Sequence, residues 1–341
     1  MDIESVSGNE RELADAVETA LRALPHLEVS RDGDSVVART NLGRPERVIL
    51  AGHLDTVPLP TVPGSRGSVP SSRDGEVLYG RGATDMKGGV AVQLALAAQL
   101  TDPTRDVTYI FYDHEEVDAS LSGLARLADS HAEWLQADFA ILLEPTNGTV
   151  EGGCNGTMRF HAATTGRAAH SARAWMGENA IHAAAEILVR LRDHQPATVS
   201  VEGLDYRESL NAVKVWGGTA GNVIPDAATV EINYRFAPDK SIEDAEAYVR
   251  NLLTGFDVVR TDAAAGARPG LNLPAAASFV AAVGAEPKPK YGWTDVARFS
   301  ALGIPAVNFG PGDALLAHTD NEHVRADAIR DCLAALRTWL S

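Results

Sequence analysis

The sequence predicts an α/β protein whose mixed-sheet catalytic domain is interrupted by a smaller α+β domain. Residues 1–156 and 269–341 alternate helical patterns with apolar, strand-like runs, whereas residues 157–268 follow a β-α-β-β-α-β order. The chain has 341 residues, of which 45% are hydrophobic, and single cores rarely grow beyond about 250–300 residues. We therefore expect two cores: a discontinuous catalytic domain and an inserted, ferredoxin-like domain.

The first stretch of the chain reads as alternating helices and strands. Leu13, Val17 and Leu21 recur at helical spacing and Pro25 closes the segment, which predicts an amphipathic helix over residues 9–24. The other elements expected here are strands at residues 36–38, 47–51, 106–112 and 137–143, a helix at residues 88–100, and a loop rich in Gly, Ser and Pro at residues 65–75. Three of these strands end beside polar residues.

The inserted stretch has the pattern of an antiparallel sheet with two helices on one face. Ser241 and Asp244 have the spacing of a capping box and mark the start of its second helix. The elements expected are strands at residues 157–165, 211–216, 228–236 and 256–260, and helices at residues 179–192 and 241–253. After a small-residue boundary at residues 263–270, the α/β pattern returns with a strand at residues 305–309 and a helix at residues 326–340.

Composition narrows the class of protein. The 46 acidic and 30 basic residues give a net charge of −16, which argues against a nucleic-acid partner or an anionic membrane partner. Two cysteines, Cys154 and Cys332, cannot form a disulfide framework in a chain of this size. We expect a cytoplasmic protein, because the sequence starts without a signal peptide and has no run of about 18 apolar residues.

Five potential metal ligands are distributed along the chain. A lone His or Asp is more often structural than catalytic, so the argument depends on their combination. Two zinc ions about 3.5–4 Å apart need one bridging carboxylate and terminal ligands on each ion. One Asp, two Glu and two His supply that set: His53, Asp85, Glu116, Glu144 and His318. We interpret them as the site of a two-metal hydrolase.

Two further carboxylates lie next to these candidates. Glu115 precedes Glu116, and adjacent residues at a strand end can take different roles, so one can bind metal while the other serves as a general base; the alternative is a solvated acidic turn. Asp55, two residues after His53, is suited to fix the tautomer of that imidazole. Its alternative role is to cap the turn that follows.

Other catalytic chemistries have weaker support. Cys154 lies in a glycine-rich loop that could expose a thiol, but no partner base is identifiable from spacing. The sequence contains no Gly-x-Ser-x-Gly nucleophile elbow and no Gly-x-Gly-x-x-Gly dinucleotide fingerprint.

The order of motifs resembles the family of dinuclear zinc hydrolases that includes aminoacylases, glutamate carboxypeptidases, acetylornithine deacetylase and succinyl-diaminopimelate desuccinylase. The resemblance covers nearly the whole chain. It consists of HLDTVP at residues 53–58, GRGATDMKGG at residues 80–89, the Glu115-Glu116 pair, Glu144-Pro145, AHSA at residues 169–172 and Ala317-His318. Within the family, EPT at residues 144–146, GCNGT at 153–157, AHSARAW at 169–175, YGWTD at 291–295 and NFGPG at 308–312 are most similar to actinobacterial desuccinylases.

The resemblance implies a role for each candidate residue. Two Zn²⁺ ions would be bound, with Co²⁺ or Mn²⁺ as possible substitutes. By this resemblance His53 and Glu144 hold one ion, Glu116 and His318 hold the other, and Asp85 bridges them. Glu115 is then the general base, and Asp55 orients His53.

The resemblance also implies that residues 157–268 form a lid that dimerises. His170 would reach across a homodimer into the partner's active site and stabilise the oxyanion; without the family, it is a single exposed histidine in a turn. Asn222 and Arg235 match lid positions that contact substrate, and a guanidinium suits a carboxylate, although Arg235 could also form a surface ion pair.

The reaction implied is hydrolysis of N-succinyl-L,L-2,6-diaminopimelate to succinate and L,L-diaminopimelate. Two departures from the family stand out. Cys154 occupies a position where other desuccinylases carry a basic residue, so succinyl recognition would depend on Arg235, Arg173 or Thr294. The chain also begins with DIESVS at residues 2–7, a segment that in the family normally follows an upstream helix. The alternatives are another N-acyl-amino-acid deacylase, such as acetylornithine deacetylase, a dipeptidase, or a relative that binds metal or peptide without catalysis.

Overall fold

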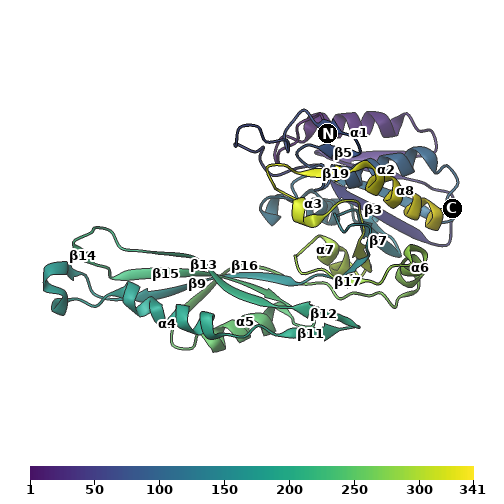
Figure 1. Ribbon diagram of the computed structural model, residues 1–341. Helices are drawn as coiled ribbons and strands as arrows, with labels where there is room; N and C mark the ends of the chain where they lie inside the picture. The colour runs from purple at the N-terminus through teal and green to yellow at the C-terminus, as the bar shows by residue number, and fades with distance from the viewer. The chain divides into compact units, whose positions relative to one another are not determined.

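The computed structural model describes residues 1–341, which divide into two compact units (Figure 1). Unit 1 contains Met1–Gly152, Gly270–Lys288 and Arg298–Ser341, and unit 2 contains Gly153–Pro269 and Pro289–Ala297. The sequence analysis places residues 289–297 in the catalytic domain. They belong to unit 2 because hydrogen bonds tie them to it, including one from the indole of Trp293 to the carbonyl of Ala265 at 3.1 Å.

Unit 1 is built on a mixed sheet, as the sequence predicts. The sheet has eight strands, three more than the sequence analysis expected. The strand order is β1-β2-β6-β3-β7-β18-β8-β17. The bounds are β1 (Glu28–Asp32), β2 (Ser35–Arg39), β3 (Arg47–His53), β6 (Asp106–Tyr112), β7 (Phe139–Leu142), β8 (Glu151–Gly152), β17 (Lys288–Pro289) and β18 (Ala306–Asn308). Strands β6, β3, β7 and β18 run parallel, whereas β1, β2 and β8 pair antiparallel.

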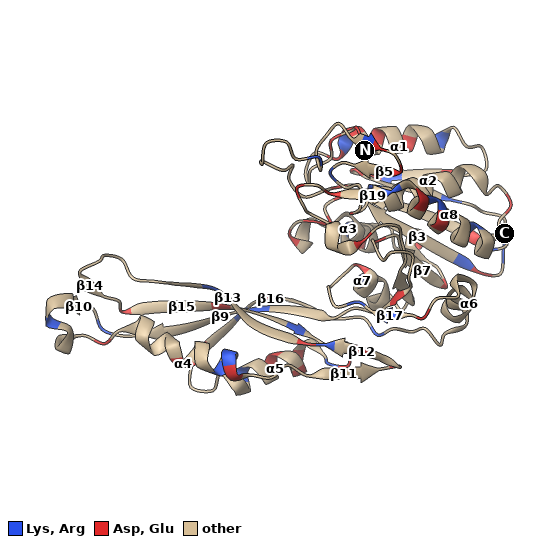
Figure 2. Cartoon of the chain, viewed as in Figure 1, with Lys and Arg blue, Asp and Glu red and all other residues tan.

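The burial of strands β3, β6 and β7 explains why their sequences are almost continuously apolar. Every residue of β6 and β7 is buried, and only the first residue of β3 is not. Such near-continuous apolar runs are typical of parallel strands that are covered on both faces. Charged residues of unit 1 lie mainly on helices and loops, and β7 carries none (Figure 2). Because the strands are parallel neighbours, their carboxyl ends meet at one edge of the sheet.

Helices cover this sheet (Figure 1). The bounds are α1 (Arg11–Arg22), α2 (Lys87–Gln99), α3 (Gly123–Ser130), α6 (Pro274–Val283), α7 (Val296–Ala301) and α8 (Ala326–Leu340). The predictions of α1, α2 and α8 are confirmed within two residues; α3, α6 and α7 were missed. Helix α2 packs closely against the end of β7, since a Cβ on Gly89 would lie 2.3 Å from the carbonyl oxygen of Leu143. Glycine therefore lets the start of α2 approach this strand end.

A small three-stranded sheet was not expected. It consists of β19 (His323–Arg325), β5 (Val77–Tyr79) and β4 (Ser72–Asp74). The prediction of an uninterrupted loop over residues 65–75 was therefore wrong at its end. Strands β4 and β5 form a hairpin around Gly75, whose φ of 57° favours glycine.

Unit 2 has the predicted antiparallel sheet with both helices on one face. The sheet order is β13-β15-β9-β16, with bounds β9 (Gly156–Thr165), β13 (Ser209–Gly217), β15 (Ala227–Phe236) and β16 (Asp257–Ala264). Helices α4 (Ala180–Asp193) and α5 (Ile242–Leu252) share one core with the sheet, and the capping box of Ser241 and Asp244 is present. The hairpin of β11 (Thr198–Val201) with β12 (Leu204–Arg207) and the pair of β10 (Ala169–His170) with β14 (Val223–Ile224) were missed.

No helix in the structure is long and apolar enough to cross a membrane. Both cysteines are free and buried.

Candidate metal centre

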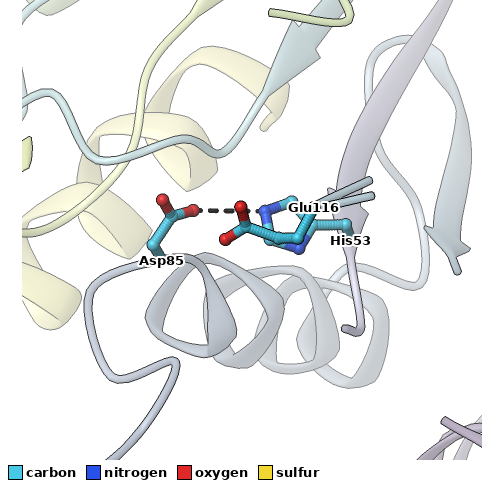
Figure 3. A group of neighbouring side chains, drawn as sticks. All are labelled: His53, Asp85 and Glu116. Atoms are coloured by element: carbon cyan, nitrogen blue, oxygen red, sulfur yellow. Dashed lines mark hydrogen bonds and ion pairs between the residues drawn. The ribbon is translucent and has the colours of Figure 1, made fainter. Parts of the chain in front are cut away.

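Three potential ligands converge at the carboxyl edge of the unit 1 sheet (Figure 3). His53 is the last residue of β3, Asp85 lies just before α2, and Glu116 follows β6. One ligand atom from each of these residues lies within 4.8 Å of the others. These three residues lie up to 63 positions apart in the sequence. They meet because two parallel strands end, and helix α2 begins, at the same place.

Asp85 presents its two carboxylate oxygens to two different imidazoles. Oδ1 lies 3.1 Å from Nε2 of His53, and Oδ2 lies 3.3 Å from Nε2 of His318. A carboxylate that bridges two metal ions must direct one oxygen to each ion. The donor set around Asp85 therefore fits a bridging position between two cations.

The remaining candidate ligands complete two groups around this carboxylate. Nε2 of His318 lies 2.8 Å from Oε1 of Glu116, and Nε2 of His53 lies 4.0 Å from Oε1 of Glu144. The structure thus brings together all five residues singled out from the sequence. Imidazole nitrogens and carboxylate oxygens of this kind are the donors that zinc uses in catalytic sites.

The carboxylates of the cluster favour positive charge on or between its imidazoles. Hydrogen bonds to Asp85 and Glu116 raise the pKa of His318 to about 10. Burial opposes the charged form of His53, but its carboxylate neighbours Asp55 and Asp85 outweigh burial and raise its pKa as well. The carboxylates thus hold protons on both imidazoles, and a divalent cation would take the place of those protons.

Asp55 fixes the loop that carries Glu115 and Glu116. Its Oδ1 accepts the main-chain amide of Glu115 and its Oδ2 that of Glu116, both at 3.0 Å. Burial would raise the pKa of Asp55, but its partners, first among them His53, outweigh burial and lower the pKa to about 2. The carboxylate is therefore ionised and rigidly placed.

The imidazole of His53 meets Asp55 mainly through the main chain. Nδ1 of His53 lies 3.0 Å from the main-chain oxygen of Asp55 and 3.5 Å from its carboxylate. With Nδ1 directed to that carbonyl, Nε2 faces Asp85 and the position of a metal ion.

Ser7 is a supporting residue that the sequence argument missed. Its hydroxyl donates to Oδ2 of Asp55 at 2.7 Å, and its amide donates to the carbonyl of Thr56 at 3.1 Å. Ser7 lies 48 positions from Asp55 in the sequence, and no local pattern links the two residues.

Two predicted lid residues lie side by side in unit 2. His170 is in β10, paired with Val223 of β14, and is exposed. The carbonyl of Asn222 accepts the amide of Ser171 at 2.9 Å, and Nδ1 of His170 accepts the amide of Ala172 at 3.1 Å. The exposed edge of His170 is thus held in a fixed direction.

Arg173, Arg235 and Thr294 also lie in unit 2, in different surroundings. Arg173 is exposed in the 3-10 segment Ser171–Met176. Arg235 is half-buried in β15, where burial and the nearby Arg159 lower its pKa, and its Nε donates to the side-chain oxygen of Asn233 at 3.3 Å. Thr294 is buried.

The thiol alternative is wrong. Cys154 is fully buried, its Sγ donates to the carbonyl of Thr294 at 3.8 Å, and burial raises its pKa to about 11. A reactive cysteine needs an accessible thiolate near neutral pH. The loop that was expected to expose this thiol instead packs it inside unit 2.

We predict that Asp55→Asn weakens metal binding by about 10–100-fold, the usual effect of losing a partner that orients ligands. The amide NH₂ cannot accept a hydrogen bond, so either Glu115 or Glu116 loses its main-chain anchor. Zinc content at buffered free-zinc concentrations measures the effect. Ser7→Ala is the control and should cause a smaller loss, because it leaves the two main-chain hydrogen bonds from Glu115 and Glu116 to the Asp55 carboxylate in place. Equal zinc affinity in Asp55→Asn and the wild type would contradict this role.

Comparisons with known proteins identify relatives of the chain. Residues 49–341 match the model of Peptidase family M20/M25/M40. The chain is 52% identical to a protein of Mycobacterium tuberculosis (strain H37Rv), provisionally named succinyl-diaminopimelate desuccinylase DapE, over all of this chain and 95% of that protein. It is 44% identical to the succinyl-diaminopimelate desuccinylase of Corynebacterium glutamicum, over all of this chain and 94% of that protein.

A solved structure shows the same fold. The M20 family metallo-carboxypeptidase Sso-CP2 from Sulfolobus solfataricus superimposes with a TM-score of 0.77 at 17% identity, covering 98% of this chain and 95% of that one. The family match, the near-complete alignment with two relatives and the shared fold lead to one conclusion: the chain belongs to Peptidase family M20/M25/M40.

Proposed function

We propose that this protein is a dinuclear zinc amidohydrolase that converts N-succinyl-L,L-2,6-diaminopimelate and water to succinate and L,L-2,6-diaminopimelate. The observation that carries the proposal is the placement of Asp85, with one oxygen toward His53 and the other toward His318. The substrate is supported by the names of the two relatives that are 52% and 44% identical over the whole chain.

The donor set assigns residues to two metal ions. His53 and Glu144 would hold one Zn²⁺, Glu116 and His318 the other, and Asp85 would contact both; Co²⁺ or Mn²⁺ could occupy the same ligands. When bound, such ions polarise an amide carbonyl and lower the pKa of a coordinated water.

Glu115 is the general base in this proposal. It follows β6 directly beside Glu116, and its main chain is anchored by Asp55 at 3.0 Å. Its carboxylate would take a proton from the attacking water and pass it to the leaving amine, as one positioned side chain can do in both steps. A binder without catalysis would have no need of a fixed base next to its metal ligands.

Residues of unit 2 would recognise the substrate. Arg235 is a half-buried guanidinium whose Nε bonds to an amide oxygen, not a carboxylate, so it is suited to bind a carboxylate of the substrate in a bidentate manner. Asn222, Arg173 and Thr294 are the other candidates for this role, with Arg173 exposed and placed three residues after His170.

We predict that zinc-loaded wild type hydrolyses N-succinyl-diaminopimelate faster than N-acetylornithine or dipeptides, and that Glu115→Gln lowers kcat by about 10²–10⁴-fold. The loss should occur without loss of bound zinc, because Glu115 is not assigned as a ligand. Glu133→Gln, at an exposed glutamate, is the matched control and should keep full activity. Cleavage of only another substrate would disprove the substrate assignment, whereas full activity of Glu115→Gln would disprove the mechanism.

We also propose that the protein is a homodimer that forms through residues 157–268. Strand β13 is at the edge of the unit 2 sheet, and its Val213, Val215 and Trp216 are exposed at 50%, 50% and 44%. An exposed, apolar edge strand is a template for pairing with another chain. Pairing of β13 with its counterpart would cover these residues.

In such a dimer, His170 would serve the active site of the partner. We predict that inactive His170→Ala and inactive Glu115→Ala chains, mixed and allowed to exchange subunits, recover part of the wild-type activity. One active site of each heterodimer would then contain both an intact Glu115 and an intact His170. The activity of the mixture relative to each variant alone is the measurement. Complete absence of recovery, with heterodimers present by mass spectrometry, would contradict a shared site.

A further inference from the structure

A buried ion pair lies next to Asp85 of the candidate metal centre. Arg81 and Glu322 are 3% and 1% exposed, and Nη1 of Arg81 lies 2.8 Å from Oε2 of Glu322. Removing two charges from water is costly and often exceeds the attraction between them, so a buried pair by itself is weak support for stability. Its remaining hydrogen bonds indicate a different role.

The Glu322 carboxylate holds the main chain at Asp85. Its Oε1 accepts the amide of Thr84 at 3.0 Å and that of Asp85 at 3.1 Å. The carbonyl of Glu322 also accepts the amide of Gly80 at 3.1 Å. Glu322 therefore anchors both ends of the loop that leads to Asp85.

The Arg81 guanidinium reaches the loop that carries His318. Nη1 of Arg81 donates to the carbonyl of Thr319 at 3.3 Å as well as to Glu322. His318, the preceding residue, has a φ of 63°, a conformation that residues other than glycine rarely adopt. A fixed neighbour is needed to keep a histidine in that conformation with its ring aimed at Asp85.

We propose that Arg81 and Glu322 are positioning residues that fix Asp85 and His318 relative to each other, and thereby set the affinity for the metal ion held by Glu116 and His318. The two residues act through the main chain at Asp85 and next to His318, because their hydrogen bonds to this region reach the amide of Asp85 and the carbonyl of Thr319. This inference rests on the proposed dinuclear site.

Glu322→Gln tests the proposal with a minimal change in size. The amide keeps Oε1 as an acceptor but has no negative charge for Arg81, so the guanidinium loses its partner and the contact to Thr319 is no longer fixed. Partners of this kind typically change metal affinity by 10–100-fold when they are replaced.

Glu208→Gln is the matched control. Glu208 is also buried, pairs with the Lys240 ammonium at 2.9 Å and accepts the amide of Ala237 at 2.8 Å. All three residues belong to unit 2, whereas the five candidate ligands belong to unit 1. If the loss of any buried carboxylate pair weakens zinc binding, both variants should bind zinc more weakly. If the loss of ligand positioning is the cause, only Glu322→Gln should do so.

The experiment measures Zn²⁺ bound to the metal-depleted full-length chain across a series of buffered free-Zn²⁺ concentrations. We expect the wild type and Glu208→Gln to bind two ions. Glu322→Gln should bind the first ion with nearly unchanged affinity and the second about 10–100-fold more weakly. Arg81→Lys, which keeps the charge but loses the guanidinium fork, should show a smaller loss at the second ion; it carries the test if Glu322→Gln does not fold.

Four outcomes would overturn the proposal. Two ions bound with wild-type affinity by a folded Glu322→Gln would exclude a positioning role, and so would unchanged affinity in Arg81→Lys if only that variant folds. An equal loss in Glu208→Gln would assign the effect to general destabilisation. If the wild type itself binds fewer than two ions, the proposed dinuclear site fails, and the inference fails with it for a reason that this measurement identifies.

Discussion

The repulsion between carboxylates around Asp85 is the constraint on which the site depends. One ligand oxygen of Asp85 and one of Glu116 lie within 4.8 Å of each other. Oε1 of Glu144 lies 4.0 Å from the His53 imidazole that Asp85 also contacts. Two unit charges 4 Å apart repel by about 4 kcal/mol at an effective dielectric constant of 20. Such a cluster is stable only with positive charge inside it, whether as protons on the imidazoles or as metal ions. The fold therefore has to hold the ligands in place against their mutual repulsion.

Main-chain anchoring is how unit 1 does this. Asp55 holds the amides of Glu115 and Glu116, and the close approach allowed by Gly89 brings the start of α2 to the end of β7. These contacts act on the backbone, so the ligand side chains stay available for metal. A rigid backbone also gives Glu115, the proposed general base, a fixed position, which is what proton transfer to and from a substrate requires.

The sequence predicts more of the fold than of the support around the site. Strands such as β6 can be predicted from a continuous run of apolar residues, and α8 from apolar residues that recur with a period of 3.6. Both patterns are local in the sequence. The candidate ligands Glu116 and Glu144 follow two of the predicted strands and could be found with them. Ser7 and Glu322 could not, because their partners are distant in the sequence, and an isolated polar residue carries no periodic signal. The same reason explains the missed pairing of β5 with β19 and the placement of residues 289–297 in unit 2.

The central claim is that Asp85 bridges two metal ions. Anomalous diffraction at the zinc absorption edge, from crystals of the zinc-loaded protein, tests it most directly. The account predicts two anomalous peaks per chain about 3.5–4 Å apart, one beside His53 and Glu144, the other beside Glu116 and His318, with Asp85 between them. A single peak at full zinc occupancy, or two peaks that Asp85 does not join, would contradict it.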